Sequence, residues 1–313
     1  MGFLRTMKLA LAGGFLTANL TSAQVAQIVV DAPLILNHYP APEERTALEQ
    51  LAEQTLLVKK EAFYAVQEQF KKDTPLHLGS GTVFAYKRDD HYTYFVTNAH
   101  VTRAEELKFR NIDTGWELTY EPKKAFYTLY DNGIENNSRG PACLLFTDKK
   151  RDIAVLYINN RDDIKVASVL SYRKPLHRGE QVRMIGYPKA TSQEILSGVV
   201  SSRTTTTNFF DTPISGYTLD MLNDAGVSGA GIFVETPDGP RWVGTAYSAR
   251  TDTRLLQMEP VEVFFDDIMA LQAINPCGGS GQTLEEIASV DVSKPKTDAP
   301  ANGKETVATS KQK

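Results

Sequence analysis

The stretches GSGTVFAY at residues 79–86 and YFVTNAHV at residues 94–101 decide how the sequence is interpreted. Both are short runs of β-branched and aromatic residues bounded by turn formers. Similar runs continue to about Ser248 and alternate with turn clusters, without helical periods between them: IAVLYI, QVRMIGY, ILSGVVSS, GIFVET and RWVGTAY. Regularly spaced short strands predict an all-β barrel or sandwich.

Two helices are expected to flank these strands. Residues 43–72 contain no glycine or proline, and apolar residues recur there at helical spacing: Leu48, Leu51, Leu56, Phe63, Val66 and Phe70. We therefore expect residues 24–74 to form an N-terminal helical extension. It would pack across the main domain, mediate homo-oligomerisation, or be a removable pro-segment. After Pro260, VEVFFDDIMALQAI predicts a closing helix over about 260–274.

The last part of the chain is expected to be a flexible tail over residues 277–313. No aromatic residue follows Phe265, and glycine, serine, threonine, lysine, aspartate and alanine dominate after Cys277. From roughly residue 290 onward the sequence has too little apolar surface to order itself by burial.

Length and composition exclude several classes. The 313 residues allow roughly two domains at about 150 residues each. Two cysteines are too few for a disulfide-framework fold or a four-cysteine zinc module, and we expect no metal or cofactor. The net charge of −4 does not favour nucleic acid, whose binding relies on clustered lysine and arginine.

The N-terminus predicts export. Arg5 and Lys8 precede the short apolar stretch LALAGGFLTANL, and Thr21-Ser22-Ala23 offers small residues for cleavage. This pattern is typical of a secretory signal peptide over residues 1–23, and a buried N-terminal helix is the alternative. No stretch reaches the roughly 18 apolar residues that a spanning helix needs. We expect a soluble periplasmic or secreted protein without stable membrane insertion.

Three segments carry candidate catalytic residues, each beside a strand. His100 stands just after the apolar strand in YFVTNAHV, Asp152 is at the head of the strand in RDIAVLYI, and Ser228 lies in the glycine-rich turn of DAGVSGAGIF. Each residue alone is more often structural. Their joint occurrence at strand edges of a β-rich chain, in the order His, Asp, Ser, favours nucleophilic catalysis.

Acyl transfer needs these residue types together. A serine hydroxyl is a weak nucleophile at neutral pH and needs an adjacent base. Histidine, with an ordinary pKa near 6.5, suits that role, and a carboxylate on its far ring nitrogen fixes the tautomer. Gly226 and Gly229 permit a tight turn around Ser228. The amides of Gly226 and Ser228 would then form an oxyanion hole, in which one donor contributes about 3–4 kcal/mol.

Other folds that use a serine nucleophile fit poorly. All five histidines precede Ser228, whereas an α/β-hydrolase has its histidine after the serine. Ala230 also replaces the second glycine of its GxSxG motif. A subtilisin-like order could use Asp152, His177 and Ser228, but that fold needs alternating strands and helices, which this region lacks.

The chain resembles the trypsin-like serine proteases, and is most similar to their HtrA-type bacterial branch. The resemblance rests on the GSG strand, VTNAHV, the D-I-A-V run, GYP at 186–188, SGVVS at 197–201 and MEPV at 258–261. Asp220 stands eight residues before Ser228, as in the family. The resemblance covers about 190 of the 313 residues. Val227 and Ala230 depart from the family's usual Asn and Gly, which puts the turn's geometry in question more than its chemistry.

The resemblance implies two six-stranded antiparallel β-barrels with the catalytic groups between them. The protease domain would span about 75–276, with barrel one over about 75–160 and barrel two over about 165–258. His100 and Asp152 would come from barrel one and Ser228 from barrel two. Fewer than 50 residues follow the closing helix, so we expect no PDZ module.

The same resemblance places the substrate pocket near Leu222 and along four residues of one strand: Thr245, Ala246, Tyr247 and Ser248. Leu222 is apolar, and no acidic residue occupies its place. A preference for lysine or arginine is therefore not expected, and a neutral apolar residue is favoured before the scissile bond. The alternative is that Leu222 is a plain core residue.

Cys143 and Cys277 are free thiols or a disulfide, which an exported compartment permits. The leading hypothesis is a serine endopeptidase that acts on protein or peptide substrates, with His100 as base, Asp152 orienting it and Ser228 as nucleophile. Two rivals remain: a catalytically inert protease-like binding module, and an esterase-like acyl hydrolase on the same fold.

Overall fold

A computed structural model describes the chain over these residues: 7–11, 14–18, 46–64, 74–110, 117–131, 137–164, 166, 171–172, 174–221, 224–249 and 255–291. The chain divides into two units, residues 1–45 and 46–313. In the first, β1 (Met7–Leu11) pairs antiparallel with β2 (Gly14–Ala18). The second unit holds all the predicted site residues.

Barrel one is a ring of six antiparallel strands. The order of the strands around the ring is β8-β3-β4-β5-β10-β9. The ring closes because β8 pairs with β9 as well as with β3. The strands have these bounds: β3 Thr55–Tyr64, β4 Leu76–Arg88, β5 Tyr92–Thr97, β8 Pro122–Tyr130, β9 Ser138–Asp148 and β10 Ile153–Asn159. A separate hairpin joins β6 (Leu107–Arg110) to β7 (Glu117–Tyr120).

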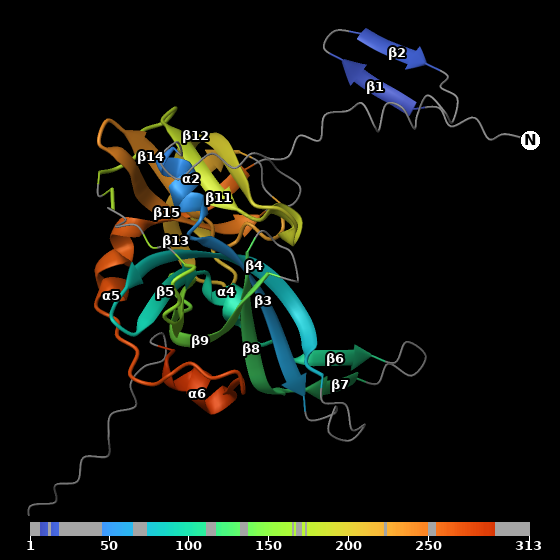
Figure 1. Cartoon of the computed structure of the whole chain (residues 1–313), viewed down its shortest axis with the longest axis vertical. Helices are drawn as coiled ribbons and strands as arrows, with labels where there is room; N and C mark the ends of the chain where they lie inside the picture. The colour runs from blue at the N-terminus through green and yellow to red at the C-terminus, as the bar shows by residue number, and fades with distance from the viewer. Residues whose placement is uncertain are drawn as a thin grey trace, which may run out of the picture. The chain divides into compact units, whose positions relative to one another are not determined.

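Barrel two is a closed barrel with the strand order β11-β12-β13-β16-β15-β14. Its strands have these bounds: β11 Gln181–Gly186, β12 Glu194–Thr207, β13 Pro213–Asp220, β14 Gly231–Thr236, β15 Gly239–Ala249 and β16 Leu255–Pro260. Figure 1 shows the two barrels one above the other, with α4 (Ala99–Thr102) close to where they meet. The all-β expectation of two six-stranded barrels is confirmed.

Side-chain alternation along the strands fills three apolar clusters. On β4, Val83 and Ala85 join the interior of barrel one, whereas Phe84 and Tyr86 point into a second cluster between the barrels. There Phe84 packs edge-on against Phe233, with ring centroids 5.2 Å apart, and also contacts Trp242. The third cluster fills barrel two. Packing in all three clusters removes apolar surface from water, and the second cluster fixes one barrel against the other.

The expected helix over 43–72 is wrong for its central part. Helix α2 covers only Ala47–Ala52, and residues 55–64 form strand β3 between β4 and β8. The run Thr55–Val58 is buried on both faces, as suits a strand inside a barrel. Barrel one therefore begins before residue 75. Since β3 completes the barrel, it is not a removable pro-segment. Residues 55–64 interrupt the long helix proposed for oligomerisation, whereas residues 43–45 and 65–72 lie outside the described residues.

The closing helix is shorter than expected. A 3₁₀ turn at Val261–Val263 leads into α5 (Phe265–Met269), and residues 270–274 lie outside any helix. The tyrosine hydroxyl of Tyr86 donates to Ile268 O at 3.0 Å, which ties the end of α5 to barrel one.

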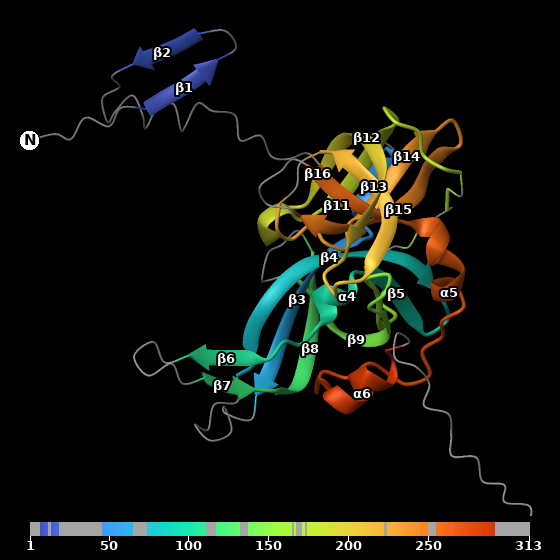
Figure 2. The same cartoon turned by 180° about the vertical axis from the view of Figure 1, so that it is seen from behind.

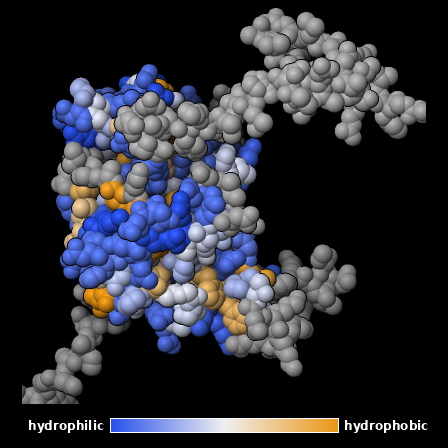
Figure 3. All heavy atoms as spheres, in the orientation of Figure 1, coloured by the Kyte–Doolittle hydropathy of each residue, from blue (hydrophilic) through white to orange (hydrophobic). Residues whose placement is uncertain are grey.

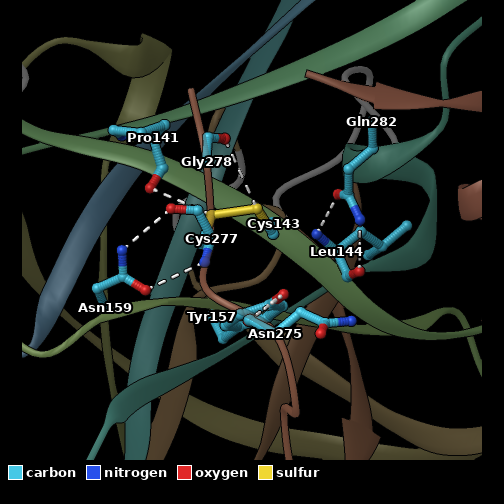
Figure 4. The surroundings of a disulfide bond; sticks show 9 residues. All are labelled: Pro141, Cys143, Leu144, Tyr157, Asn159, Asn275, Cys277, Gly278 and Gln282. Carbon is cyan, nitrogen blue, oxygen red and sulfur yellow. Dashed lines mark hydrogen bonds between the residues drawn. A yellow bond between two sulfur atoms is a disulfide. The ribbon is translucent and has the colours of Figure 1, made fainter. Parts of the chain in front are cut away.

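The expected flexible tail is folded as far as Asp291. Cys277 forms a disulfide with Cys143, with Cα atoms 5.6 Å apart, and the peptide of Cys277 exchanges two hydrogen bonds with the Asn159 amide (Figure 4). Strand β17 (Gln282–Thr283) then pairs with β8, and α6 (Leu284–Ser289) follows. The expectation of a tail rested on composition alone, and composition does not reveal a disulfide or hydrogen bonds to residues that are distant in sequence.

The surface agrees with the polar composition. On the face shown in Figure 3, hydrophilic residues cover most of the coloured area and hydrophobic residues appear in small separate areas. Within the described ranges, no helix is both long and apolar enough to cross a bilayer. The same ranges contain no cluster of three or more His, Cys, Asp or Glu side chains placed to hold a metal ion.

Candidate active site

The imidazole of His100 is fixed from one side by a carboxylate. His100 lies in α4, the short helix that follows β5, and its Nδ1 is 2.7 Å from Asp152 Oδ2. The other carboxylate oxygen, Oδ1, accepts the backbone amide of His100 at 2.9 Å. Because Asp152 Oδ2 accepts a hydrogen bond from Nδ1–H, the Nε2 atom is left as the basic nitrogen.

Asp152 is held in an uncommon backbone conformation. It has a φ of +52° and is completely buried, in the turn that leads into β10. Its carbonyl oxygen accepts both the amide of Ala99 and the side-chain amide of Asn98, each at 3.0 Å. Aspartate tolerates the left-handed region better than most residues, and these bonds keep the carboxylate aimed at His100.

Ser228 lies in a turn of barrel two that only glycine could complete. Gly229 has a φ of +89°, and a Cβ there would come within 2.1 Å of Thr82 O and 2.3 Å of Thr97 Oγ1. The turn therefore presses directly on the barrel-one strands that lead to His100. Gly81 shows the same closeness, because a Cβ there would meet both the Val101 side chain and Ser228 O.

The amides of this turn alternate between bonded and free. Val227 N donates to Asp224 O and Gly229 N donates to Ala246 O. In the part of the chain that the structure describes, the amides of Gly226 and Ser228 have no hydrogen-bond acceptor. These are the two donors expected for an oxyanion hole. Two neighbouring unpaired donors in a tight turn provide a place for developing negative charge.

Thr82 connects the turn to barrel one, and sequence reasoning missed it. Its amide donates to Ser228 O at 2.8 Å, and its hydroxyl donates to Gly226 O at 2.8 Å. The same hydroxyl accepts the amide of Tyr187 at 3.1 Å. Thr82 belongs to the GSGT motif that indicated the fold, so its motif was visible although its contacts were not.

The two departures from the family pattern fit their surroundings. Val227 is buried and packs in the apolar cluster of barrel two, where it anchors the turn. Ala230 needs space that Gly186 provides, since a Cβ on Gly186 would lie 2.9 Å from the Ala230 methyl. Neither change alters a backbone donor of the turn.

The structure joins His100 to Asp152 but leaves Ser228 unbonded to the imidazole. Among the described residues no hydrogen bond links Ser228 Oγ to His100, although the half-buried Ser228 lies in the turn that packs against the strands leading to His100. Catalytic hydrogen bonds in unliganded enzymes are often long and tighten when substrate binds. His100 and Asp152 are thus hydrogen-bonded to each other, and Ser228 lies in the adjoining turn of barrel two without a hydrogen bond to the imidazole in the described residues.

An aromatic ring covers one face of the imidazole. Phe209 stacks on His100 with ring centroids 5.1 Å apart and an interplanar angle of 24°. It comes from the tip of the hairpin between β12 and β13, in barrel two. Nothing in the sequence around NFFD indicated this contact, because it joins residues far apart in the chain.

A buried acid also lies near the site. Burial, and then the negative charge of Asp152, raise the pKa of Glu259 to about 9. Glu259 faces Thr245 across β16 and β15, and its Oε2 atom and the Thr245 hydroxyl have no partner in the described residues. Burial and then the charges of Glu259 and Asp152 raise the pKa of Tyr247 to about 12.

The expected substrate strand runs beside the nucleophile turn. Ala246 O accepts the amide of Gly229, and Ala246 N donates to Ala230 O. Thr245, Ala246 and Tyr247 are buried, and the Tyr247 hydroxyl bonds Thr206 on β12. Ser248 pairs with Gln257 in the sheet. Leu222 lies outside the described residues, so the pocket expected around it stays a prediction.

Comparison with known proteins agrees with this architecture. No curated protein matches the sequence. Among solved structures, the active form of the Rv3671c protease from M. tuberculosis has a TM-score of 0.52 at 15% identity, and the match covers 75% of this chain and 88% of that chain. The HtrA-type protease AlgW, solved with a tripeptide, has a TM-score of 0.50 at 14% identity, covering 72% of this chain and 62% of that one. At these identities the structures establish the fold alone.

The sequence itself matches the trypsin-like peptidase domain over residues 79–244, more than half of the chain. The matched segment begins at the GSG strand, ends within β15, and includes His100, Asp152 and Ser228. The chain therefore belongs to the trypsin-like peptidase family of serine proteases.

Proposed function

We propose that the protein is a serine endopeptidase that cleaves peptide bonds through His100, Asp152 and Ser228. The observation that carries the proposal is the pairing of a fixed His100–Asp152 couple with a turn that presents two free amides around Ser228. A base with a fixed tautomer and an anion-binding turn are the two requirements of acyl transfer to serine.

In the proposed reaction, substrate binding brings Ser228 Oγ to His100 Nε2. The imidazole takes the hydroxyl proton as Oγ attacks the peptide carbonyl, and Asp152 stabilises the imidazolium. The amides of Gly226 and Ser228 bind the oxyanion. His100 then gives its proton to the leaving amine, which departs and leaves an acyl-enzyme. Water activated by the same imidazole hydrolyses the ester and restores the serine.

Two variants test this role. The wild-type chain should digest unfolded casein and react with a fluorophosphonate probe, whereas Ser228→Ala should lose about 10⁶-fold in rate. His100→Ala should fall similarly, because base and nucleophile act as a unit. Equal digestion by wild type and Ser228→Ala would contradict the proposal. A folded wild-type chain that neither digests casein nor takes up the probe would favour an inert binding module.

A small ester separates the remaining alternative. An esterase would turn over the ester and leave casein intact, whereas an endopeptidase should cleave both. The comparison needs the Ser228→Ala chain as its control, so that only the activity lost in that variant is counted.

We also propose that the protein is exported. The proposal rests on Arg5 and Lys8 before a short apolar stretch, and on the small residues Thr21-Ser22-Ala23. Expression of the full chain in a bacterial host should give a protein outside the cytoplasm whose N-terminal residue is Gln24. An intact Met1 on the cytoplasmic protein would contradict it.

A further inference from the structure

Phe209 is an exposed aromatic residue held rigidly at the site. Its side chain remains 56% exposed while its ring stacks on His100. Single exposed apolar residues are common on protein surfaces and need no explanation. Phe209 differs because the chain fixes it on the one imidazole that the proposed reaction uses.

The hairpin tip that carries Phe209 is fastened to barrel one. The side-chain oxygen of Asn208 accepts the amides of Phe210 and Thr212, at 2.8 and 3.0 Å. Its side-chain nitrogen donates to Lys149 O at 2.8 Å and to Lys150 O at 3.2 Å. Those two carbonyls belong to the turn just before Asp152. A buried asparagine therefore sets the hairpin tip of barrel two against the turn that supplies the catalytic acid.

The neighbouring aromatic residue supports the same placement. Phe210 is partly buried against the barrel-one cluster, and the Arg103 guanidinium lies 5.7 Å from its ring centroid. Phe209 meets Phe210 edge-on, with centroids 6.0 Å apart. His100 lies in α4, and Arg103 is the residue that caps the end of this helix. The two phenylalanines therefore contact both the base and the end of the helix that carries it. Phe210 is the structural member of the pair, and Phe209 faces solvent.

The geometry of proton transfer by His100 indicates which part of a substrate would contact the Phe209 ring. His100 must lie beside both Ser228 Oγ and the leaving nitrogen when it moves the proton. A ring stacked on His100 consequently lies beside the scissile bond. Phe209 offers no hydrogen bond, so an uncharged substrate side chain gains there by removing apolar surface from water.

We propose that Phe209 is a specificity-determining residue, whose exposed ring selects an apolar substrate side chain adjacent to the scissile bond. The inference rests on the proposed endopeptidase function and adds a substrate preference to it. An acidic or amide side chain at that position would lose hydration against the ring without compensation. Contacts of this size discriminate between side chains by about 10-fold or more.

The cleavage profile of a peptide pool tests the preference without a known substrate. Full-length wild type, Phe209→Ala and Phe209→Glu are incubated with peptides from a denatured proteome, and the cleaved bonds are identified by mass spectrometry. Wild type should enrich apolar residues at one position beside the bond. Phe209→Ala should reduce that enrichment about 10-fold while other positions keep theirs, and Phe209→Glu should shift the same position toward lysine and arginine.

The control is Ile274→Ala, which removes an exposed apolar side chain that is not at the site. Its profile should match that of wild type. Uniformly slower cleavage of every peptide by Phe209→Ala, with an unchanged profile, would overturn the proposal. That result would assign Phe209 a merely structural role.

A binding arm separates this proposal from the proposed function. Immobilised Ser228→Ala and Ser228→Ala/Phe209→Ala chains are exposed to the same pool, and the retained peptides are sequenced. If wild type does not cleave but Ser228→Ala retains apolar peptides in a Phe209-dependent way, the peptidase function fails and the selective ring stands. Serine-dependent cleavage with identical profiles for wild type and Phe209→Ala, and identical capture by the two Ser228→Ala chains, would support the peptidase function and contradict the proposed role of Phe209.

Discussion

At the scale of single residues, Thr82 shows how a motif in one barrel controls a turn in the other. Its hydroxyl bridges Gly226 O and Tyr187 N, and it is completely buried. A valine of the same shape would leave the Tyr187 amide unpaired in the interior, at a cost of about 1–3 kcal/mol. The nucleophile turn would lose its side-chain link to barrel one.

We therefore expect Thr82→Val to lower kcat/KM on a cleavable peptide by about 10²-fold, because small displacements of catalytic groups cost that much. Thr82→Ser keeps the hydroxyl and is the matched control, which should stay within a few-fold of wild type. Equal activity of Thr82→Val and Thr82→Ser, measured well below the melting temperature of both, would show that the turn holds its shape without this bridge.

Glu259 makes the stability of the fold depend on pH. Its pKa of about 9, against an ordinary value of 4.5, means that the folded chain keeps a proton which the unfolded chain has lost. The folded state thus binds more protons between these two values. The free energy of unfolding consequently falls as the pH rises from about 4.5 to about 9, by up to about 1.4 kcal/mol per pH unit. Above the folded-state pKa of about 9 it falls no further.

The variant Glu259→Gln removes this titration while keeping the side-chain shape. Urea denaturation at pH 6, 7 and 8 should give it a flatter dependence of unfolding free energy on pH than wild type, with the difference growing by about 1.4 kcal/mol per unit. Parallel pH curves for the two proteins would mean that Glu259 is ionised in the folded state.

The sequence predicted some site residues and not others for a physical reason. His100, Asp152 and Ser228 lie in local patterns, a strand end or a glycine turn, that imply their positions without knowledge of the whole fold. Phe209 and Glu259 act through contacts between strands that are distant in sequence. No local pattern distinguishes an exposed loop phenylalanine from one that stacks on a histidine.

At the scale of elements, β3 and the segment after Cys277 are where sequence reasoning failed. The spacing of Leu48, Leu51 and Leu56 suits a helix, and α2 does begin there. Beyond it, Val58, Lys60, Ala62 and Tyr64 are all buried, a period of two that pairing with β4 and β8 enforces. Pairing between distant strands outweighs local helix preference, because propensity is only a weak prior.

The disulfide is the covalent anchor of the C-terminal segment. Cys143 and Cys277 are 134 residues apart, so their bond restricts a long loop of the unfolded chain. Chain entropy assigns about 5 kcal/mol to a loop of this size. Gln282 adds a side-chain anchor by exchanging hydrogen bonds with the peptide of Leu144 on β9.

Replacing both cysteines by alanine should lower the unfolding free energy by about 2–5 kcal/mol, as measured by urea denaturation. Reduction of the wild-type chain should lower it by a comparable amount. The decreases in unfolding free energy should agree because the double substitution and the reduction both remove the Cys143–Cys277 disulfide. If neither treatment moves the urea midpoint, the polar anchors at Asn159 and Gln282 hold the segment without it.

At the scale of the whole molecule, the site exists only where the two barrels meet. His100 and Asp152 come from barrel one and Ser228 and Phe209 from barrel two, and α4 lies close to both barrels in Figures 1 and 2. Phe84 and Trp242 pack between the barrels and hold them together. Loss of either barrel's closure should therefore remove the site without changing any catalytic residue.

Strand β3 provides the sharpest test of this dependence. A chain that begins at Pro75 retains the whole GSG strand and every proposed catalytic residue, but it lacks the strand that pairs with both β4 and β8. Two neighbouring strands would then expose unpaired edges, which template aggregation. A chain that begins at Thr46 keeps β3 and α2, and belongs to one unit.

We expect the chain from Thr46 to melt cooperatively and to react with the fluorophosphonate probe at Ser228. The chain from Pro75 should be insoluble or lack a cooperative transition, and should take up no probe. Because the two chains differ only in residues 46–74, a cooperative melt and equal labelling of the shorter one would show that barrel one closes without β3. The protease domain would then begin at residue 75, as its sequence alone suggests.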